Sequence, residues 1–203
     1  MIGDGDSLRW PLAAVMAFTL LSCGANQQDS RSRTDSSAIN KTAEDTMAAS
    51  GKFLVMSTAF KEGEAIPKEY TADGKNISPP LRWESVPAGT KSFALVADDP
   101  DAPMGTWVHW VIFNIPSGET GLAEHVPTTA SLPDGALQGT NGSHEIGYDG
   151  PSPPSGTHRY YFKLYALDAM LKLSSGITKP ELLKAMEGHI RAQAQTMGRY
   201  SRK

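Results

Sequence analysis

From residue 53 onward, the chain alternates short apolar runs with segments that favour turns. The runs are rich in Val, Ile, Phe, Trp and Tyr, the residue types that suit a pleated and half-buried strand surface. We therefore predict strands at 53–60, 93–97, 107–115 and 160–166. The third run gives the strongest signal, and it ends at Pro116 because proline cannot donate a backbone hydrogen bond to a sheet.

A single helical pattern lies near the C-terminal end. Thr178-Lys-Pro-Glu181 fits a capping box with proline in the first helical turn. Five apolar residues follow at helical spacing: Leu182, Leu183, Met186, Ile190 and Ala194. These observations predict a helix that extends from the capping box to Ala194, weakened by roughly 1 kcal/mol at Gly188.

The segment between Pro116 and Thr157 is rich in Gly, Pro, Ser and Asn. A loop of this length inside a compact domain is usually functional or disordered. The strands and the helix together predict a mostly β domain with a few helices packed at one edge. The 203 residues are enough for one domain of ordinary size.

The composition is that of a globular protein, with 39% apolar and 20% charged residues, and it excludes collagen-like, coiled-coil and fully disordered chains. Lys and Arg number 19 against 22 Asp and Glu, so the net charge of −3 offers no basic face for nucleic acid. The single cysteine excludes an internal disulfide.

Residues 12–21 form an apolar run that is shorter than the roughly 20 residues needed to span a bilayer. Its length is typical of a signal-peptide core, and it leads into Leu20-Leu-Ser-Cys23-Gly24, which resembles the lipobox of bacterial lipoproteins. In a lipobox the cysteine is acylated and becomes the first mature residue. The alternative is a buried core helix with a chance cysteine. Asp4 and Asp6 are atypical of the positively charged start of a leader.

We therefore predict a lipoprotein signal peptide at 1–22, a lipidated Cys23 that begins a disordered tether at 23–50, and a folded domain at 51–203. Palmitate is the expected kind of modification. A flexible tether of this length has a root-mean-square reach of roughly 25–30 Å. Gly24, in place of Asp, resembles lipoproteins sent to an outer membrane. The expected location is the bacterial cell envelope, at the outer membrane if the cell has one, with the domain in the periplasm or outside.

Two of the candidate chemical segments lie at the second and third predicted strands. Asp98-Asp99-Pro-Asp101-Ala-Pro103 places three carboxylates in a stretch that two prolines stiffen, although a solvated acidic turn would look the same. On the next strand, period-two alternation places Trp107 and His109 on one face together with Val111 and Phe113. A histidine in such apolar surroundings needs a partner or stays neutral, and a satisfied core histidine is the alternative.

The third segment, Gly156-Thr-His158-Arg-Tyr160, leads into the fourth predicted strand. His158 and Tyr160 share one face, and Arg159 points to the other. A histidine and a tyrosine hydroxyl at a strand entrance suit a small anion, whereas the alternative is a strand start with ordinary hydrogen bonds.

Taken together, these segments resemble the phosphatidylethanolamine-binding protein family, and in particular its bacterial Raf-kinase-inhibitor-like branch. The matching residues run through the predicted domain: Tyr70-Thr-Ala-Asp-Gly74, Asn76-Ile-Ser-Pro-Pro-Leu81, Trp83, Asp99-Pro-Asp-Ala-Pro103, Trp107-Val-His109, Gly147-Tyr-Asp-Gly-Pro151, Pro153-Pro154 and His158-Arg-Tyr160. The resemblance implies a large central antiparallel sheet flanked by a smaller sheet and a C-terminal helix. It also implies a small pocket for a phosphate-type headgroup or a similar anion.

Carried over onto this chain, the resemblance implies a ligand site formed by Asp99, His109, His158 and Tyr160, with Asp101, Pro103 and Trp107 shaping its wall. It also implies that Arg159 is structural and pairs with an acidic residue of the Asp-Pro-Asp segment. Many bacterial relatives carry cysteines where this chain has Ala72 and Ser152, so no thiol function of that pair is expected here. Only Gly105 and Thr106 separate Met104 from Trp107, so the rim of the pocket is short.

The functional hypothesis is a lipid-anchored binding module for a small anionic ligand or a phospholipid headgroup. The alternative is an envelope interaction protein that inhibits a kinase or protease through the segment between Pro116 and Thr157 and an unidentified protein partner. A hydrolase or metalloenzyme is disfavoured, because the chain lacks His-Glu-x-x-His, Gly-x-Ser-x-Gly and phosphate-loop motifs. We expect no catalytic residue, metal ligand, cofactor or nucleic-acid partner. His125, His144 and His189 are interpreted as surface or structural residues, and Met170, Met186 and Met197 as packing residues.

Overall fold

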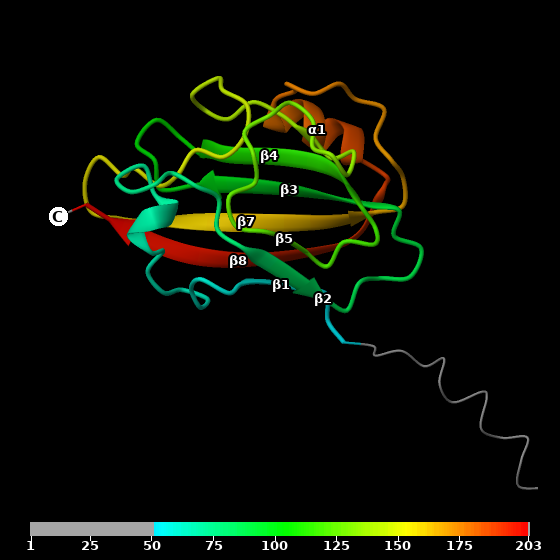
Figure 1. The fold of residues 1–203 in the computed structure, drawn as a ribbon, viewed down its shortest axis with the longest axis horizontal. Helices are drawn as coiled ribbons and strands as arrows, with labels where there is room; N and C mark the ends of the chain where they lie inside the picture. The colour runs from blue at the N-terminus through cyan, green and yellow to red at the C-terminus, as the bar shows by residue number, and fades with distance from the viewer. Residues whose placement is uncertain (1–50, 203) are drawn as a thin grey trace, which may run out of the picture. The chain divides into compact units, whose positions relative to one another are not determined.

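The computed structural model describes residues 51–202, which form two antiparallel sheets and one α-helix (Figure 1). The predicted signal peptide, the lipidation site at Cys23 and the tether lie outside the described residues. The smaller sheet has the order β1 (Leu54–Ser57), β2 (Leu81–Glu84), β5 (Gly121–Leu122). The larger has the order β6 (Leu137–Gln138), β4 (Trp107–Pro116), β3 (Ser92–Asp99), β7 (Thr157–Leu167), β8 (Ile190–Ser201). A 3₁₀ turn, η1, spans Lys68–Tyr70, and the α-helix α1 spans Lys179–Met186.

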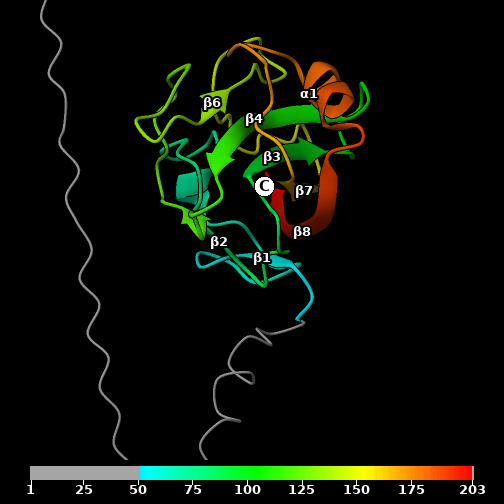
Figure 2. The ribbon, with the colours of Figure 1, turned by 90° about the vertical axis from the view of Figure 1, so that its right-hand side faces the viewer.

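The two antiparallel sheets and the single α-helix of the described residues confirm the predicted mostly β architecture. The larger sheet is covered on both faces. Figure 2 shows the small sheet on one side of it and α1 on the other. On the first side, Phe93 of β3 packs against the ring of Trp83 from β2, with a centroid separation of 5.1 Å. On the second side, Leu182 and Met186 of α1 are fully buried. Every residue of β3 is therefore buried, as expected for a central strand. No helix within residues 51–202 is long and apolar enough to cross a membrane.

The predicted extension of the helix to Ala194 is wrong, because Ile190 and Ala194 belong to β8. The capping box does form, since the Glu181 carboxylate accepts a hydrogen bond of 2.7 Å from the backbone N–H of Thr178. Gly188 then adopts a φ of +78°, a conformation that ends helices and that glycine tolerates best. After Gly188, the backbone of β8 pairs with β7 over the whole length of the strand. A longer helix would lose these hydrogen bonds between the two strands.

The long segment after Pro116 is held in place by one buried side chain, Gln138 of β6. Its amide donates to the carbonyl oxygens of Pro127 and Thr129 at 2.6 and 2.8 Å. Its side-chain oxygen accepts from the indole N–H of Trp110 at 2.7 Å. The short strands β5 and β6 lie within this segment, and they join it to the smaller and the larger sheet.

A β-bulge at His109 overturns the predicted alternation along β4. Trp110 pairs with Ala97 and Val108 pairs with Asp98, so His109 is the extra residue between the two pairs. A bulge of this kind re-aims the side chain that it carries. His109 consequently packs edge-on against Tyr160, which belongs to the core on the small-sheet side, whereas Val111 and Phe113 belong to the core under α1.

The N-terminal end of the domain lies against β8. Lys52, Phe53 and Leu54 lie beside Gln193–Gln195, near the start of that strand.

The predicted packing role of the methionines is confirmed only in part. Met186 is fully buried. Met170 is half-exposed, so that prediction is wrong, because Met170 follows β7 in the surface connection to α1.

A buried carboxylate ties β3 to both β7 and α1. Asp98 has no exposed surface, and its oxygens accept hydrogen bonds from the Lys163 ammonium at 2.8 and 3.0 Å and from the Lys179 ammonium. Lys179 opens α1, so this cluster fixes where the helix begins against the sheet. Removing one partner of a buried ion pair leaves the remaining charges uncompensated.

We predict that Asp98→Asn lowers the free energy of unfolding by about 3 kcal/mol, because two partly buried ammonium groups lose their counter-charge. Urea-induced unfolding measures the change. The matched control is Glu84→Gln, which disrupts the exposed Arg82–Glu84 pair of 2.8 Å and should change stability by less than about 1 kcal/mol. Equal losses in the two variants would contradict the prediction.

Candidate functional site

A cavity of about 180 Å³ opens where β3 ends and where β4 and β7 begin. Six of the seven residues predicted for the ligand site line it: Asp99, Pro103, Trp107, His109, His158 and Tyr160. The seventh, Asp101, lies outside the cavity. We call this cavity the pocket.

Five further residues line the pocket: Ala102, Met104, Ser152, Pro153 and Pro154. Sequence reasoning did not assign them to the site. Pro153 and Pro154 stand in a motif that carried the family resemblance, which was the available signal for this wall. Ser152, Pro153 and Pro154 come from the loop that precedes β7, so their place in the wall depends on how that loop folds back over the strand ends.

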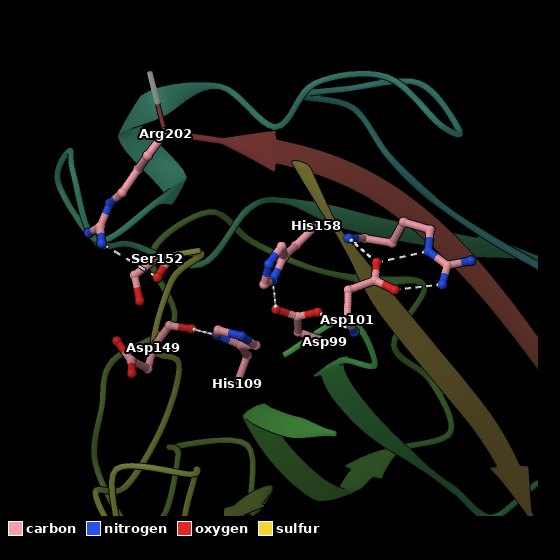
Figure 3. Close-up of polar contacts among 8 residues, drawn as sticks. Asp99, Asp101, His109, Asp149, Ser152, His158 and Arg202 are labelled. Carbon is pink, nitrogen blue, oxygen red and sulfur yellow. Dashed lines mark hydrogen bonds and ion pairs between the residues drawn. The ribbon is translucent and has the colours of Figure 1, made fainter. Parts of the chain in front are cut away.

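His158 is anchored by Asp99, as Figure 3 shows. The Nδ1–H group of His158 donates to Asp99 Oδ2 at 2.7 Å, and both side chains are buried. The other oxygen of Asp99 accepts from the backbone N–H of Asp101 at 2.8 Å, which closes the Asp-Pro-Asp turn. Asp99 is thus occupied in orienting the ring, and Nε2 of His158 remains for a ligand.

His109 is anchored by the backbone of Asp149 (Figure 3). Its Nδ1–H donates to the Asp149 carbonyl oxygen at 2.6 Å, while the Asp149 N–H donates to the His109 carbonyl oxygen at 2.9 Å. Burial lowers the pKa of His109, because the charged ring would be poorly solvated there. The neutral ring carries its proton on Nδ1, so Nε2 is a hydrogen-bond acceptor.

Tyr160 supplies a buried hydroxyl beside His109. The two rings meet edge-on with centroids 5.1 Å apart. The hydroxyl makes no hydrogen bond to any residue in the described part of the chain. Burial raises the pKa of Tyr160, so the group stays protonated and can donate. A buried polar group of this kind favours a ligand that satisfies it.

Asp101 is occupied by Arg159, the pairing that the resemblance implied. Its two oxygens accept from Nε and Nη2 of Arg159 at 2.9 and 2.6 Å, and one oxygen also accepts from the Arg159 backbone N–H at 3.0 Å. The hydrogen bonds from Arg159 lower the pKa of Asp101 to about 2. The pair clamps the Asp-Pro-Asp turn onto β7, next to His158.

The walls of the pocket rest on two further contacts. Arg202 forms a bidentate pair with Asp73. It also donates weakly to the Ser152 carbonyl oxygen at 3.5 Å, as Figure 3 shows. The indole of Trp107 lies against Gly142, where an added Cβ would stand 2.5 Å from the ring. A side chain at residue 142 would therefore push Trp107 from its place.

No lysine or arginine of the described chain lines the pocket, so its lining holds no permanent positive charge. The only possible cations of this lining are the protonated forms of His109 and His158. Residues 51–202 contain no group of three or more His, Cys, Asp or Glu side chains placed to hold a metal ion. The arrangement can supply one hydroxyl donor and two imidazole Nε2 atoms, each of which accepts when neutral and donates when protonated.

A small pocket at the strand ends of a two-sheet β domain, lined by apolar side chains and a few convergent polar groups, is consistent with a small ligand-binding module. A family model described as phosphatidylethanolamine-binding protein matches residues 56–201. The chain is 56% identical over 144 residues to the UPF0098 protein of Methanothermobacter thermautotrophicus, which covers 71% of this chain and 95% of that one. It is 49% identical over 151 residues to the UPF0098 protein of Aquifex aeolicus, covering 73% and 88%.

Two solved structures are also similar. The crystal structure of a putative phosphatidylethanolamine-binding protein homologue, CT736 from Chlamydia trachomatis, has a TM-score of 0.70 and 43% identity, covering 76% of this chain and all of that one. The structure of E. coli YbcL, described as a new member of the mammalian family, has a TM-score of 0.68 and 34% identity, covering 75% and all of that chain. The chain belongs to the phosphatidylethanolamine-binding protein family.

We predict that His109 titrates below about 6.5, the ordinary histidine value, because burial favours its neutral form. Histidine-selective NMR over a pH series measures the midpoint and identifies Nδ1 as the protonated nitrogen. As the pH falls, His109 of the unfolded chain would be protonated before His109 of the folded protein. The neutral ring therefore contributes stability above a pH of about 6.5, the ordinary histidine pKa. This contribution is lost as the pH falls through the lower pKa of the folded protein. A midpoint at or above the ordinary value would contradict the assignment.

Proposed function

We propose that this protein is a binding module whose pocket holds a phosphate-type headgroup or a similar small anion. The observation that carries the proposal is the meeting of two anchored imidazoles, His109 and His158, with the hydroxyl of Tyr160, unpaired within residues 51–202, in one small cavity. Each imidazole has Nδ1 occupied by a protein acceptor, so both present Nε2 to a ligand. The buried Tyr160 hydroxyl adds a donor.

Anion binding in this pocket is coupled to proton uptake. A neutral imidazole Nε2 repels the lone pairs of an anion, whereas an imidazolium donates a charge-assisted hydrogen bond. The anion therefore favours the protonated form of an imidazole that it contacts, and a proton enters with it. Since His109 begins with a lowered pKa, this coupling acts at and below neutral pH.

The mouth of the pocket is apolar and favours a ligand with an organic group beyond the anion. Met104 is 96% exposed and Trp107 is 38% exposed, and both stand at the pocket. Pro153 and Pro154 form part of the same lining. An alkyl or aromatic group attached to the anion would cover this surface, which supports an ester over a free inorganic ion.

Sulfate tests the charge logic because its charge is constant over the relevant pH range. We predict that its affinity rises as the pH falls from 7.5 to 5.5, by up to about tenfold per pH unit where one proton is taken up. Isothermal titration calorimetry measures the affinity, and two buffers of different ionisation enthalpy measure the protons.

His158→Ala should abolish sulfate binding, and Tyr160→Phe should weaken it about tenfold through the lost hydroxyl donor. His189→Gln is the matched control, because His189 pairs with Asp168 outside the pocket. The proposal fails if the wild type does not bind sulfate or if His158→Ala binds it equally well.

We further propose that Cys23 is lipidated and that the domain is held at a bacterial membrane. The support is the lipobox-like sequence Leu20-Leu-Ser-Cys23-Gly24, the single cysteine of the chain and the apolar run before it. The membrane contact would then be made by lipid. The proposed location is the cell envelope, with the domain in the periplasm or outside.

Expression of the full chain in a bacterium should place the protein in the detergent-rich phase of a Triton X-114 separation. Cys23→Ala should move it to the aqueous phase, because the modified thiol is lost. Mass spectrometry of the mature N-terminus identifies the acyl groups. Detergent partitioning that does not depend on Cys23 would contradict lipidation.

A further inference from the structure

A second, wider hollow lies beside the pocket, on the other side of His158. It has a volume of about 570 Å³ and is open to solvent. Its lining includes Ser155 and Gly156 before β7, Thr157 at the start of β7, and the side chains of Arg159 and Arg199. We call it the arginine hollow. His158 lines both cavities, so its buried side chain stands at the boundary between them.

The two arginines stand directly opposite each other on neighbouring strands. Arg159 of β7 pairs in register with Arg199 of β8, so their side chains leave the same face of the sheet. Like charges in this arrangement destabilise a sheet. Arg159 is neutralised by Asp101, but Arg199 forms no ion pair with any residue between 51 and 202. The hollow therefore has an excess of positive charge that the fold does not use.

The other groups around the hollow are mainly donors. The Asp101 carboxylate already accepts three hydrogen bonds from Arg159. The backbone N–H groups of Ser155 and Gly156 make no hydrogen bond within the described chain, and Gly156 has a φ of +69°. With the hydroxyls of Ser155 and Thr157 and the guanidinium of Arg199, the hollow can surround an oxyanion with donors.

We propose that the arginine hollow is a second anion subsite, and that the ligand of the pocket is a small molecule with two phosphate-type groups, one on each side of His158. This inference rests on the proposed function of the pocket. Linking two anions makes the second contact intramolecular, so a molecule of matching length binds more tightly than either group alone. His158 and its Asp99 partner would then stand between the two negative groups.

The test compares methylphosphonate with methane-, ethane-, propane- and butane-bisphosphonates carrying phosphonates at both ends. Calorimetry is performed on the full chain at one fixed pH. We expect one spacer length to bind at least about tenfold more tightly than methylphosphonate. Arg199→Gln should remove this gain and leave the methylphosphonate affinity within about twofold, whereas Arg199→Lys should retain part of the gain through its charge.

Arg191→Gln is the matched control. Arg191 is an exposed arginine of the same strand that lies near Asp168, at the other end of β8. The Arg191→Gln variant should bind every bisphosphonate with the affinity of the wild type. The inference is overturned if no bisphosphonate exceeds methylphosphonate by more than the statistical factor of two, or if the gain survives in Arg199→Gln.

The two proposals fail in different ways. Methylphosphonate binding without a bisphosphonate gain would support the pocket and overturn the second subsite. Bisphosphonate binding that needs Arg199 but survives His158→Ala would overturn the pocket's part in the site, and with it the bridging ligand. Binding of neither class would overturn both.

Discussion

Two adjacent buried carboxylates at the end of β3 are the constraint on which the rest of the structure depends. Because neighbouring residues of a strand face opposite sides of the sheet, Asp98 points toward α1 and Asp99 toward the pocket. Both reach across to β7, where Asp98 holds Lys163 and Asp99 holds His158. One dipeptide thus fixes the start of the helix, the pairing of two central strands and the direction of the pocket's buried imidazole. Each carboxylate is accepted in the interior only because charged or polar partners surround it.

Local pattern predicted the main strands and the capping box, and the family resemblance supplied six residues that line the pocket. Tertiary pairing decided what these two sources missed. Ile190 and Ala194 are spaced for a helix, yet they also fit a strand with alternating burial, and the free edge of β7 determined the outcome. The orientation of His109 depended on a bulge, which shifts the alternation by one residue and leaves no clear mark on the sequence. Asp101 was expected in the wall because it shares a motif with Asp99. Its bonds to Arg159 draw it to the other side of His158.

If the pocket binds an anion, as we propose, its positive charge is conditional on the protonation of its histidines. The protein is acidic, and the side chains around the cavity include a carboxylate and no permanent cation. An anion that enters would have to bring or attract protons, so the protonation of the imidazoles would set the selectivity of the proposed site. The arginine hollow offers the permanent charge that the pocket lacks. The two cavities would therefore differ in pH dependence although they share His158.

The point at which the chain enters the domain has a consequence for access to the pocket. Lys52 and its neighbours lie beside Gln193–Gln195, whereas His158 pairs with Tyr200 near the other end of the same strand. Six residues of extended chain separate Ala194 from Tyr200, a length of roughly 20 Å. If the N-terminus is fastened to a bilayer through Cys23, as we propose, the pocket lies toward the far end of this strand from the point at which the chain enters the domain. The attachment itself would then leave the opening of the pocket uncovered.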